Sequence, residues 1–420
     1  MMLASIPPAT VHEGHSAVVL SGGGARGAYE AGVLRYIYGE LAARHGVPRV
    51  DIVSGTSVGA INGAFLGSVS HDPVAGIHRL SDLWSALALD QVLGFGMLQA
   101  AKLPRVLFGG RQGAGLFDVS PLIRIVGENM RWVDLARNLR RGHLQAVTVS
   151  ATHVATGRPW CFVDRAPGMP LPEKLPPMMT VKPEHIGPQH VLASAAIPVL
   201  FPPVSVNDEL FVDGGLRLNT PMAPAIQLGA RRILVIGMTT APHVPAVPAF
   251  APGVYPGIAF LLGKVLNAFL LDHVNADFYE LERVNKLIDD GVAIFGPEFV
   301  SRMNARALAE GRPPRHRLHA TAIHPSEDIG RLAAAHLRTH QTRFGKIMGR
   351  SMLRLLDLGA GAEADLVSYL MFDGEFALQL MELGEQDARR REEDLARFFW
   401  GTRATVEPHF PPGKPVDGSR

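Results

Sequence analysis

The sequence predicts an α/β fold in three layers, with a central mixed or mostly parallel sheet between helices and a helical region toward the C-terminus. The main observation is the order of elements near the N-terminus, where short apolar runs alternate with helical patterns. This strand–helix–strand–helix order is typical of βαβ units in a parallel sheet. A second observation is that 47% of the 420 residues are hydrophobic and only 19% are charged, which is enough apolar side chain to form a packed core.

The first four elements carry the clearest patterns. The apolar run 17–20 ends in glycines and predicts a buried strand. Residues 28–45 repeat apolar side chains at helical spacing and are followed by Gly and Pro, which predicts a helix and its end. Residues 50–54 predict the second strand. Residues 58–67 predict a helix whose glycines recur every four residues, so that one bare face can pack closely on the sheet.

The later elements are less regular, and their patterns predict type better than boundaries. Further strands are predicted at 144–154, 160–163, 210–213 and 232–236, and further helices within 80–108 and at 258–287, 326–354 and 363–400. We expect five segments: a flexible N-terminus 1–15, a catalytic domain 16–240, helical and lid additions 241–355 that complete this domain, C-terminal helices 356–406 and a flexible tail 407–420.

Charge and cysteine content exclude several classes of protein. The net charge is +2, which makes no electrostatic case for a nucleic-acid partner. The single cysteine, Cys161, excludes an internal disulfide framework and is expected to be a buried, inert thiol. His336 and His340 lie one helical turn apart, but no nearby carboxylate is expected to complete a metal site with them.

The strongest chemical signal is the pentapeptide Gly55-Thr56-Ser57-Val58-Gly59 between a predicted strand and a predicted helix. It has the G-x-S-x-G pattern of a nucleophile elbow in the required context. The sharp turn pushes the serine into an unfavourable backbone region, and the flanking glycines leave room for the crowding. The helix N-terminus beside Ser57 favours developing negative charge.

A glycine loop directly after the first strand forms the second signal. Successive glycines let backbone N–H groups point into one concavity that holds an anion. The residues concerned are Gly22, Gly23, Gly24, Arg26 and Gly27. Their spacing also satisfies the dinucleotide pattern G-x-G-x-x-G, but the acidic candidate, Asp51, stands at the start of the second strand rather than its end. We therefore favour an oxyanion hole, in which Arg26 either steadies the loop or meets an anionic headgroup.

The third signal is Asp213-Gly214-Gly215 at the end of an apolar run. An acidic residue that leaves a strand before glycines is well placed to face a site at the carboxyl edge of the sheet.

Together these three motifs, in this order, closely resemble the patatin-like phospholipases. The resemblance extends over about residues 16–240 and includes further matches at Ala193-Ser194-Ala195-Ala196-Ile197-Pro198, Phe201, Pro202, Asn219 and Pro221. It implies a patatin-like three-layer fold and a Ser57–Asp213 catalytic dyad with the glycine loop as oxyanion hole. It also implies that no cofactor or metal is needed, and that the substrate is a phospholipid, lysophospholipid or other lipid ester.

The residues alone leave several alternative functions and mechanisms open. An acyltransferase would use the same dyad, and a lipid-binding or dinucleotide-binding protein without catalysis would use the same loop. The 17 histidines also allow a Ser-His-Asp triad, although none stands in a motif-like context. The sequence does not specify the headgroup, the acyl-chain length or the oligomeric state.

Two apolar stretches are candidates for lipid contact. The uncharged stretch 241–256 contains five prolines and leads into an apolar helix. It predicts a flap over the Ser57 cleft, with Phe250, Tyr255, Phe260 and Leu261 against the acyl pocket. The second stretch is 92–108. Prolines interrupt the longest uncharged run and no signal peptide is recognisable, so we expect a cytoplasmic protein that contacts a membrane at its surface at most.

Overall fold

The structure of the chain is a computed structural model. It describes residues 14–89, 120–171, 179–198, 200–240, 274–311, 314–340 and 365–401. The predicted flap 241–256 with the start of its helix, the whole of the apolar stretch 92–108, and nearly all of the two predicted flexible ends therefore lie outside the described residues.

A single sheet organises the described part of the chain, and it contains nine strands in the path β5-β4-β3-β2-β1-β8-β9, with β7 paired to β3 and β6 paired to β7. The strands are β1 His15–Leu20, β2 Ile52–Thr56, β3 Ala146–His153, β4 Pro159–Arg165, β5 Thr180–Pro183, β6 Val204–Val206, β7 Glu209–Asp213, β8 Ala230–Ile236 and β9 His319–Ile323. The ladders from β3 through β9 along the path are all parallel, whereas β4 and β7 run antiparallel to β3. The prediction of a mostly parallel sheet is confirmed.

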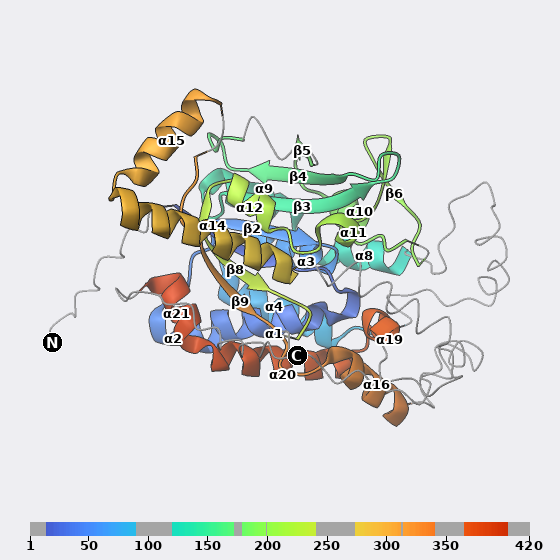
Figure 1. Cartoon of the computed structure of the whole chain (residues 1–420). Helices are drawn as coiled ribbons and strands as arrows, with labels where there is room; N and C mark the ends of the chain where they lie inside the picture. Colours follow the sequence, from blue (N-terminus) through green and yellow to red (C-terminus); the bar gives the residue numbers. More distant parts are fainter. Residues whose placement is uncertain are drawn as a thin grey trace, which may run out of the picture.

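Helices cover both faces of this sheet (Figure 1). In the N-terminal half they are α1 Gly27–Tyr36, a π-helical turn Ile37–Leu41, α2 Ala42–His45, α3 Val58–Ser68, α4 Pro73–Ser85, α8 Ser120–Asn129 and α9 Trp132–Arg141. The later helices are α10 Pro188–Ser194, α11 Gly215–Leu218, α12 Met222–Gln227, α14 Val274–Phe295, α15 Phe299–Ala309, α16 Ile329–Thr339, α19 Asp365–Leu370, α20 Gly374–Arg390 and α21 Glu392–Trp400.

The alternation of side chains in the central strands separates two apolar layers. In β1, Val18 and Leu20 join the core with α1, α3 and α4, whereas Ala17 and Val19 join a second core with α12 and α14. Successive side chains of a strand point to opposite faces, so a strand buried on both sides is apolar throughout. The sheet therefore lies between two helical layers.

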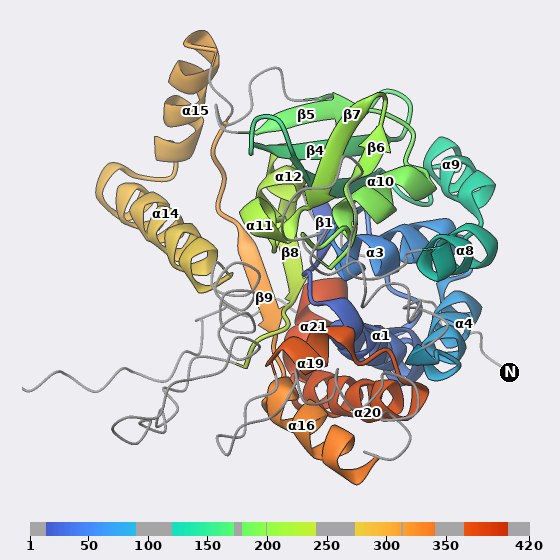
Figure 2. The same cartoon turned by 90° about the vertical axis from the view of Figure 1, so that its right-hand side faces the viewer.

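The C-terminal helices belong to the same body as the sheet. Figures 1 and 2 show α20 running alongside α1, and these two helices make extensive contacts. The predicted helical region 363–400 is interrupted between α19 and α20, where Asp373 accepts a hydrogen bond from the N–H of Phe376 and starts a new helix. The predicted single helix 28–45 likewise contains the π-helical turn.

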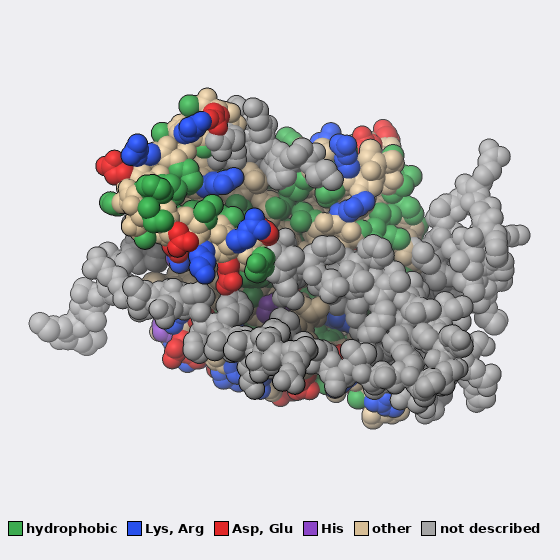
Figure 3. Space-filling model, viewed as in Figure 1, with side chains coloured by type: hydrophobic (Ala, Val, Ile, Leu, Met, Phe, Trp, Pro, Cys, Tyr) green, Lys and Arg blue, Asp and Glu red, His purple; other side chains and the backbone are tan. Residues whose placement is uncertain are grey.

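The helices α14 and α15 expose an unusual amount of apolar side chain. Leu287, Ile294, Phe295 and Leu308 are 61–72% exposed, and hydrophobic and basic side chains are interspersed over these helices in Figure 3. Within the part of the chain that the structure describes, no helix is both long and apolar enough to cross a membrane.

Candidate active site

Ser57 lies at the carboxyl end of β2, directly before α3, in a strained backbone conformation with φ 55° and ψ −127°. The turn is tight because a Cβ on Gly55 would overlap the backbone of Gly59, and a Cβ on Gly59 would overlap the carbonyl of Leu20. Only glycine allows such a close approach of backbone to backbone. The expected elbow geometry is thus present around Ser57.

Asp213 reaches Ser57 through the register of the sheet. Thr56 pairs with Ser150 of β3, and the next residue, Ala151, pairs with Asp213 of the antiparallel β7. The Oγ of Ser57 donates a hydrogen bond of 2.6 Å to Oδ2 of Asp213. The N–H of Gly215 donates to the other carboxylate oxygen at 2.7 Å. Directly after the aspartate, a Cβ on Gly214 would overlap the carbonyl oxygen of Ser150, which explains the glycine there.

The environment of Asp213 makes it an unusual carboxylate. Its side chain is fully buried, and burial raises its pKa from 3.8 to about 7, against the opposing effect of the hydrogen bonds from Ser57 and Gly215. Removal from water penalises the charged form of a carboxylate. Asp213 therefore changes protonation state near neutral pH, where a general base is most effective.

The glycine loop lies against Ser57. The N–H of Gly22 donates to the carbonyl of Asn219 at 3.2 Å, and a Cβ on Gly22 would lie 3.0 Å from the Cβ of Ser57. Among the described residues, the N–H groups of Gly23 and Gly24 donate no hydrogen bond. Gly24 lines the same cavity as Ser57, and an oxyanion site requires backbone donors of this kind close to the nucleophile.

Two of the alternatives from the sequence, the dinucleotide site and the Ser-His-Asp triad, find no support in this arrangement. Asp51 accepts a hydrogen bond from the N–H of Ser16 at the start of β1, so it lies at the opposite edge of the sheet from the glycine loop and cannot meet a ribose bound there. None of the described histidines bonds to Ser57 or Asp213 or lines the adjoining cavity.

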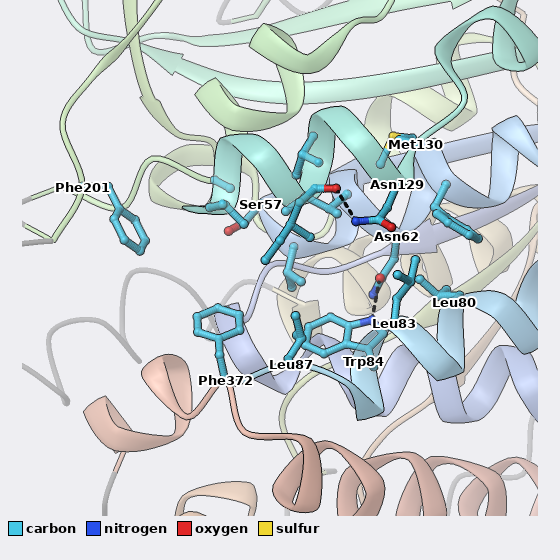
Figure 4. Close-up of a pocket in the computed structure, with 18 of the residues that line it drawn as sticks. Ser57, Asn62, Leu80, Leu83, Trp84, Leu87, Asn129, Met130, Phe201 and Phe372 are labelled. Carbon is cyan, nitrogen blue, oxygen red and sulfur yellow. Dashed lines mark hydrogen bonds between the residues drawn. The ribbon is translucent and has the colours of Figure 1, made fainter. Parts of the chain in front are cut away.

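An apolar cavity adjoins Ser57 (Figure 4). Apart from Ser57, Asn62, Asn129 and the backbone of Gly24, its lining is aliphatic and aromatic. The apolar residues are Val58, Ile61, Phe65, Leu80, Leu83, Trp84, Leu87, Leu122, Ile125, Val126, Met130, Ala195, Ile197, Phe201 and Phe372. Figure 4 shows Met130 and Leu80 on the side of the cavity away from Phe201, with Ser57 toward the Phe201 side. Such a cavity suits a hydrocarbon chain.

A buried polar network that the sequence did not reveal supports the wall of this cavity. Asn62 donates to Glu30 at 2.8 Å and accepts from the indole N–H of Trp84 at 3.1 Å. Burial raises the pKa of Glu30 well above its usual value, because removal from water penalises the charged carboxylate. Glu30 lies in α1 and Asn62 in α3, so the two side chains meet only because these helices pack together. No local sequence motif predicts this contact.

The C-terminal region also contributes to the site, which no motif predicted. Phe372 lines the cavity, and the guanidinium of Arg26 lies over the ring of Tyr369 rather than beside Ser57. The expectation that no carboxylate lies near the histidine pair of α16 is wrong, because His336 Nε2 lies 3.1 Å from Asp373 and His340 Nε2 lies 3.2 Å from Glu375. Folding brings α20 beside α16, and a sequence pattern along one helix cannot show this.

The fold and the site define a class: three-layer α/β proteins with a serine at a strand-to-helix elbow, hydrogen-bonded to a buried aspartate. Residues 18–226 match the family model described as patatin-like phospholipase. The chain therefore contains a patatin-like phospholipase domain, and the resemblance seen in the motifs is confirmed. A domain of this family supports lipid hydrolase activity.

Two solved structures show a distant likeness. The crystal structure of VipD from Legionella pneumophila aligns with 90% of this chain and 67% of that chain, at 13% identity and a TM-score of 0.34. The heterodimeric complex ExoU-SpcU from the type III secretion system of Pseudomonas aeruginosa aligns with 91% of this chain and 77% of that chain, at 16% identity and a TM-score of 0.26. A comparison with curated protein sequences gave no match. The assignment to the family rests on the family model.

Proposed function

We propose that this protein hydrolyses carboxylic esters of phospholipids or lysophospholipids, with Ser57 as nucleophile and Asp213 as general base. The observation that carries the proposal is the 2.6 Å hydrogen bond from the strained serine to the fully buried aspartate. A nucleophile and a base within hydrogen-bond reach are the minimal requirement for covalent catalysis.

In the acylation half-reaction, Ser57 Oγ attacks the ester carbonyl carbon while its proton passes to Asp213. The carbonyl oxygen gains negative charge and is bound by the N–H groups of Gly23 and Gly24. The C–O bond to the alcohol then breaks, and Asp213 returns the proton to the departing alkoxide. A base with a pKa of about 7 takes this proton far more readily than an ordinary carboxylate.

In the deacylation half-reaction, Asp213 takes a proton from water, and the resulting nucleophile attacks the acyl-Ser57 carbonyl. Collapse of the second tetrahedral intermediate releases the fatty acid and restores the serine, which regains its proton from Asp213. The protein's own residues supply every proton transfer in this cycle.

The cavity beside Ser57 supports a substrate with a hydrocarbon chain. Its lining is almost entirely apolar, and burying hydrocarbon releases about 0.8 kcal/mol for each CH₂ group. A long acyl chain therefore supplies binding energy that a short acyl group lacks.

The test combines labelling and turnover. A fluorophosphonate probe should label the wild-type protein at Ser57, and phospholipid and lysophospholipid panels should be hydrolysed. Ser57→Ala and Asp213→Asn should each lower turnover by on the order of 10⁴-fold or more, and the double variant should be little worse because the two groups act as a unit.

Matched controls separate chemistry from folding. Ser68→Ala removes a buried serine of the same helix that donates only to the carbonyl of Phe65, and Asp164→Asn alters a buried carboxylate outside the cavity lining. Both should retain turnover. Folded Asp213→Asn protein with wild-type turnover would refute the dyad. Acyl transfer to an added alcohol in place of fatty-acid release would assign the same dyad to an acyltransferase, and absence of labelling would indicate a non-catalytic protein.

A further inference from the structure

The side chain of Arg26, in the glycine loop, is held by residues from the far end of the chain. Its Nε donates a hydrogen bond of 2.8 Å to Ser368 Oγ, and its Cζ lies 4.4 Å from the centroid of the Tyr369 ring. Arg26 is 4% exposed, and Ser368 and Tyr369 are fully buried. Burial strengthens a cation–π contact because water no longer screens the charge, so Tyr369 and Ser368 hold the guanidinium in place.

The backbone of the same segment also touches the loop. Gly24 has φ +58°, and a Cβ there would overlap the carbonyl oxygen of Tyr369. On its other side the loop lies against Asn219 and Ser57, at Gly22. The two N–H donors of the loop are thus held between the nucleophile on one side and residues 368–369 on the other.

The segment that makes these contacts is itself firmly anchored. Ser368 and Tyr369 lie in α19, and a short turn leads from α19 to Asp373, which starts α20 and is hydrogen-bonded to the buried His336. Helix α20 is in turn tied to α1 by the bond from the Tyr29 hydroxyl to Asp387, 3.1 Å long. Helix α1 begins at Gly27, directly after the glycine loop. Arg26 is therefore attached to α1, and its partners Ser368 and Tyr369 precede α20, which packs on α1.

We propose that Ser368 and Tyr369 are positioning residues that hold Arg26 and thereby aim the N–H groups of Gly23 and Gly24 at the reacting carbonyl. This inference rests on the proposed function, since it assigns the loop to the oxyanion. Both residues lie outside the 18–226 region that matches the family model, so the C-terminal region completes the active site of this chain. The alternative role for Arg26, contact with an anionic headgroup, conflicts with its burial beneath Tyr369.

The consequence is a specific kinetic pattern. An oxyanion donor acts on the transition state and not on the bound ester, so its displacement lowers kcat and leaves KM unchanged. Loss of one donor costs about 10²–10³-fold in kcat in other enzymes, and a loosened loop should cost less. The loss should be equal for an uncharged soluble ester and for an anionic phospholipid, because no headgroup is involved.

The experiment uses the full chain and four variants. Ser368→Ala and Tyr369→Leu remove the two contacts with Arg26, whereas Tyr369→Phe keeps the ring. Phe376→Leu is the control, because Phe376 is fully buried in the same region but belongs to neither the loop nor the cavity lining. For each protein, kcat and KM are measured on p-nitrophenyl butyrate and on phosphatidylglycerol in mixed micelles, together with Tm and the rate of fluorophosphonate labelling.

We expect Ser368→Ala and Tyr369→Leu to lower kcat about tenfold or more on both substrates, to slow labelling in parallel and to leave KM within about twofold. Tyr369→Phe should keep kcat within about threefold, and Phe376→Leu should lower Tm but not kcat. Wild-type kcat in folded Tyr369→Leu would overturn the inference, as would a loss confined to the anionic lipid. If the wild-type protein itself fails to label at Ser57, the proposed function is refuted and the inference with it.

Discussion

At the level of single residues, the backbone strain is concentrated on the nucleophile. Within the described ranges, only Ser57, Asn207 and Asp208 have positive φ without being glycine. Asn207 and Asp208 form the turn of the β6–β7 hairpin, where such residues are favoured. Ser57 does not belong to such a turn, and a positive φ is energetically unfavourable for serine. The surrounding packing of Gly55, Gly59 and Leu20 imposes it. The result is a buried serine at the end of β2 that lines the apolar cavity.

The raised pKa of Asp213 predicts the pH dependence of activity. The base must be ionised to accept the proton of Ser57, and its pKa is about 7. We therefore expect kcat/KM on a short soluble ester to rise tenfold per pH unit below this value and to level off above it. A profile between about pH 5 and pH 9 checks this, and a limb centred near pH 4 would show that Asp213 is not the titrating base.

The same shift predicts a cost in stability. Between 3.8 and about 7, the folded protein keeps a proton on Asp213 that the unfolded chain has released, so the free energy of unfolding falls as the pH rises through this window. Asp213→Asn removes this dependence. We expect the variant to be more stable than wild type by on the order of 1–4 kcal/mol above pH 7 and equal to it near pH 4.

Calorimetric Tm values for both proteins across this range provide the measurement. The difference in Tm should grow as the pH rises and then become constant. A difference independent of pH would mean that the hydrogen bond from Ser57, and not ionisation, dominates the contribution of Asp213 to stability.

At the level of elements, the contact between α1 and α20 depends on two glycines. A Cβ on Gly32 of α1 would overlap the backbone of Met381, and a Cβ on Gly384 of α20 would overlap the carbonyl oxygen of Tyr29. The two helices therefore touch backbone to backbone at these points. This close approach lets the Tyr29 hydroxyl reach Asp387 and sets the position of the segment that contacts the glycine loop.

Gly384→Ala should therefore destabilise the protein by about 1–3 kcal/mol through overpacking. It should also lower turnover, because α20 follows directly after α19, which carries the residues that hold Arg26. The matched control is Gly127→Ala in α8, where a Cβ meets nothing within 4 Å. That change should be neutral or stabilise by up to about 1 kcal/mol, because alanine is the better helix former. Urea unfolding of wild type and the two variants measures these free energies. Unchanged stability of Gly384→Ala would show that the helices leave room for a methyl group at this point.

At the level of the whole molecule, the cavity beside Ser57 is assembled from pieces that are far apart in the sequence. Helices α3, α4 and α8 supply most of the lining, the segment after α10 adds Ile197 and Phe201, and the segment before α20 adds Phe372. An acyl chain that enters the cavity thus contacts both the family domain and the C-terminal region. In the proposed function, we expect the far wall, where Met130 and Leu80 lie (Figure 4), to limit the length of this chain.

Filling this far wall should shorten the preferred acyl chain. Met130→Trp adds volume at a position that is 6% exposed, so we expect activity on long-chain esters to fall about tenfold relative to short-chain esters, with kcat on the short esters retained. Met169→Trp, at a methionine of equal burial in the core on the other face of the sheet, controls for general destabilisation. Parallel loss on all chain lengths would place Met130 outside the acyl site.

Most of what the sequence predicted is local. The strands 17–20, 50–54, 144–154 and 232–236 were placed within two residues of the observed ones, because alternating apolar runs and helical periodicity are properties of neighbouring residues. The elbow around Ser57 and the glycine loop could also be predicted from the sequence. Each needs a backbone conformation or a close backbone contact that only glycine allows, so glycines recur there at fixed spacing. The family followed from the order of these motifs along the chain.

Contacts between distant residues could not be predicted in the same way. The hydrogen bond from Ser57 to Asp213 depends on the antiparallel pairing of β7 with β3, and the pKa of about 7 depends on the burial that this pairing causes. The contact of Arg26 with Ser368 joins residues 342 positions apart, and β9 joins the sheet beside β8 from outside the family match. Desolvation and packing arise from the whole fold, so the chemistry of the site emerges only when these remote segments meet.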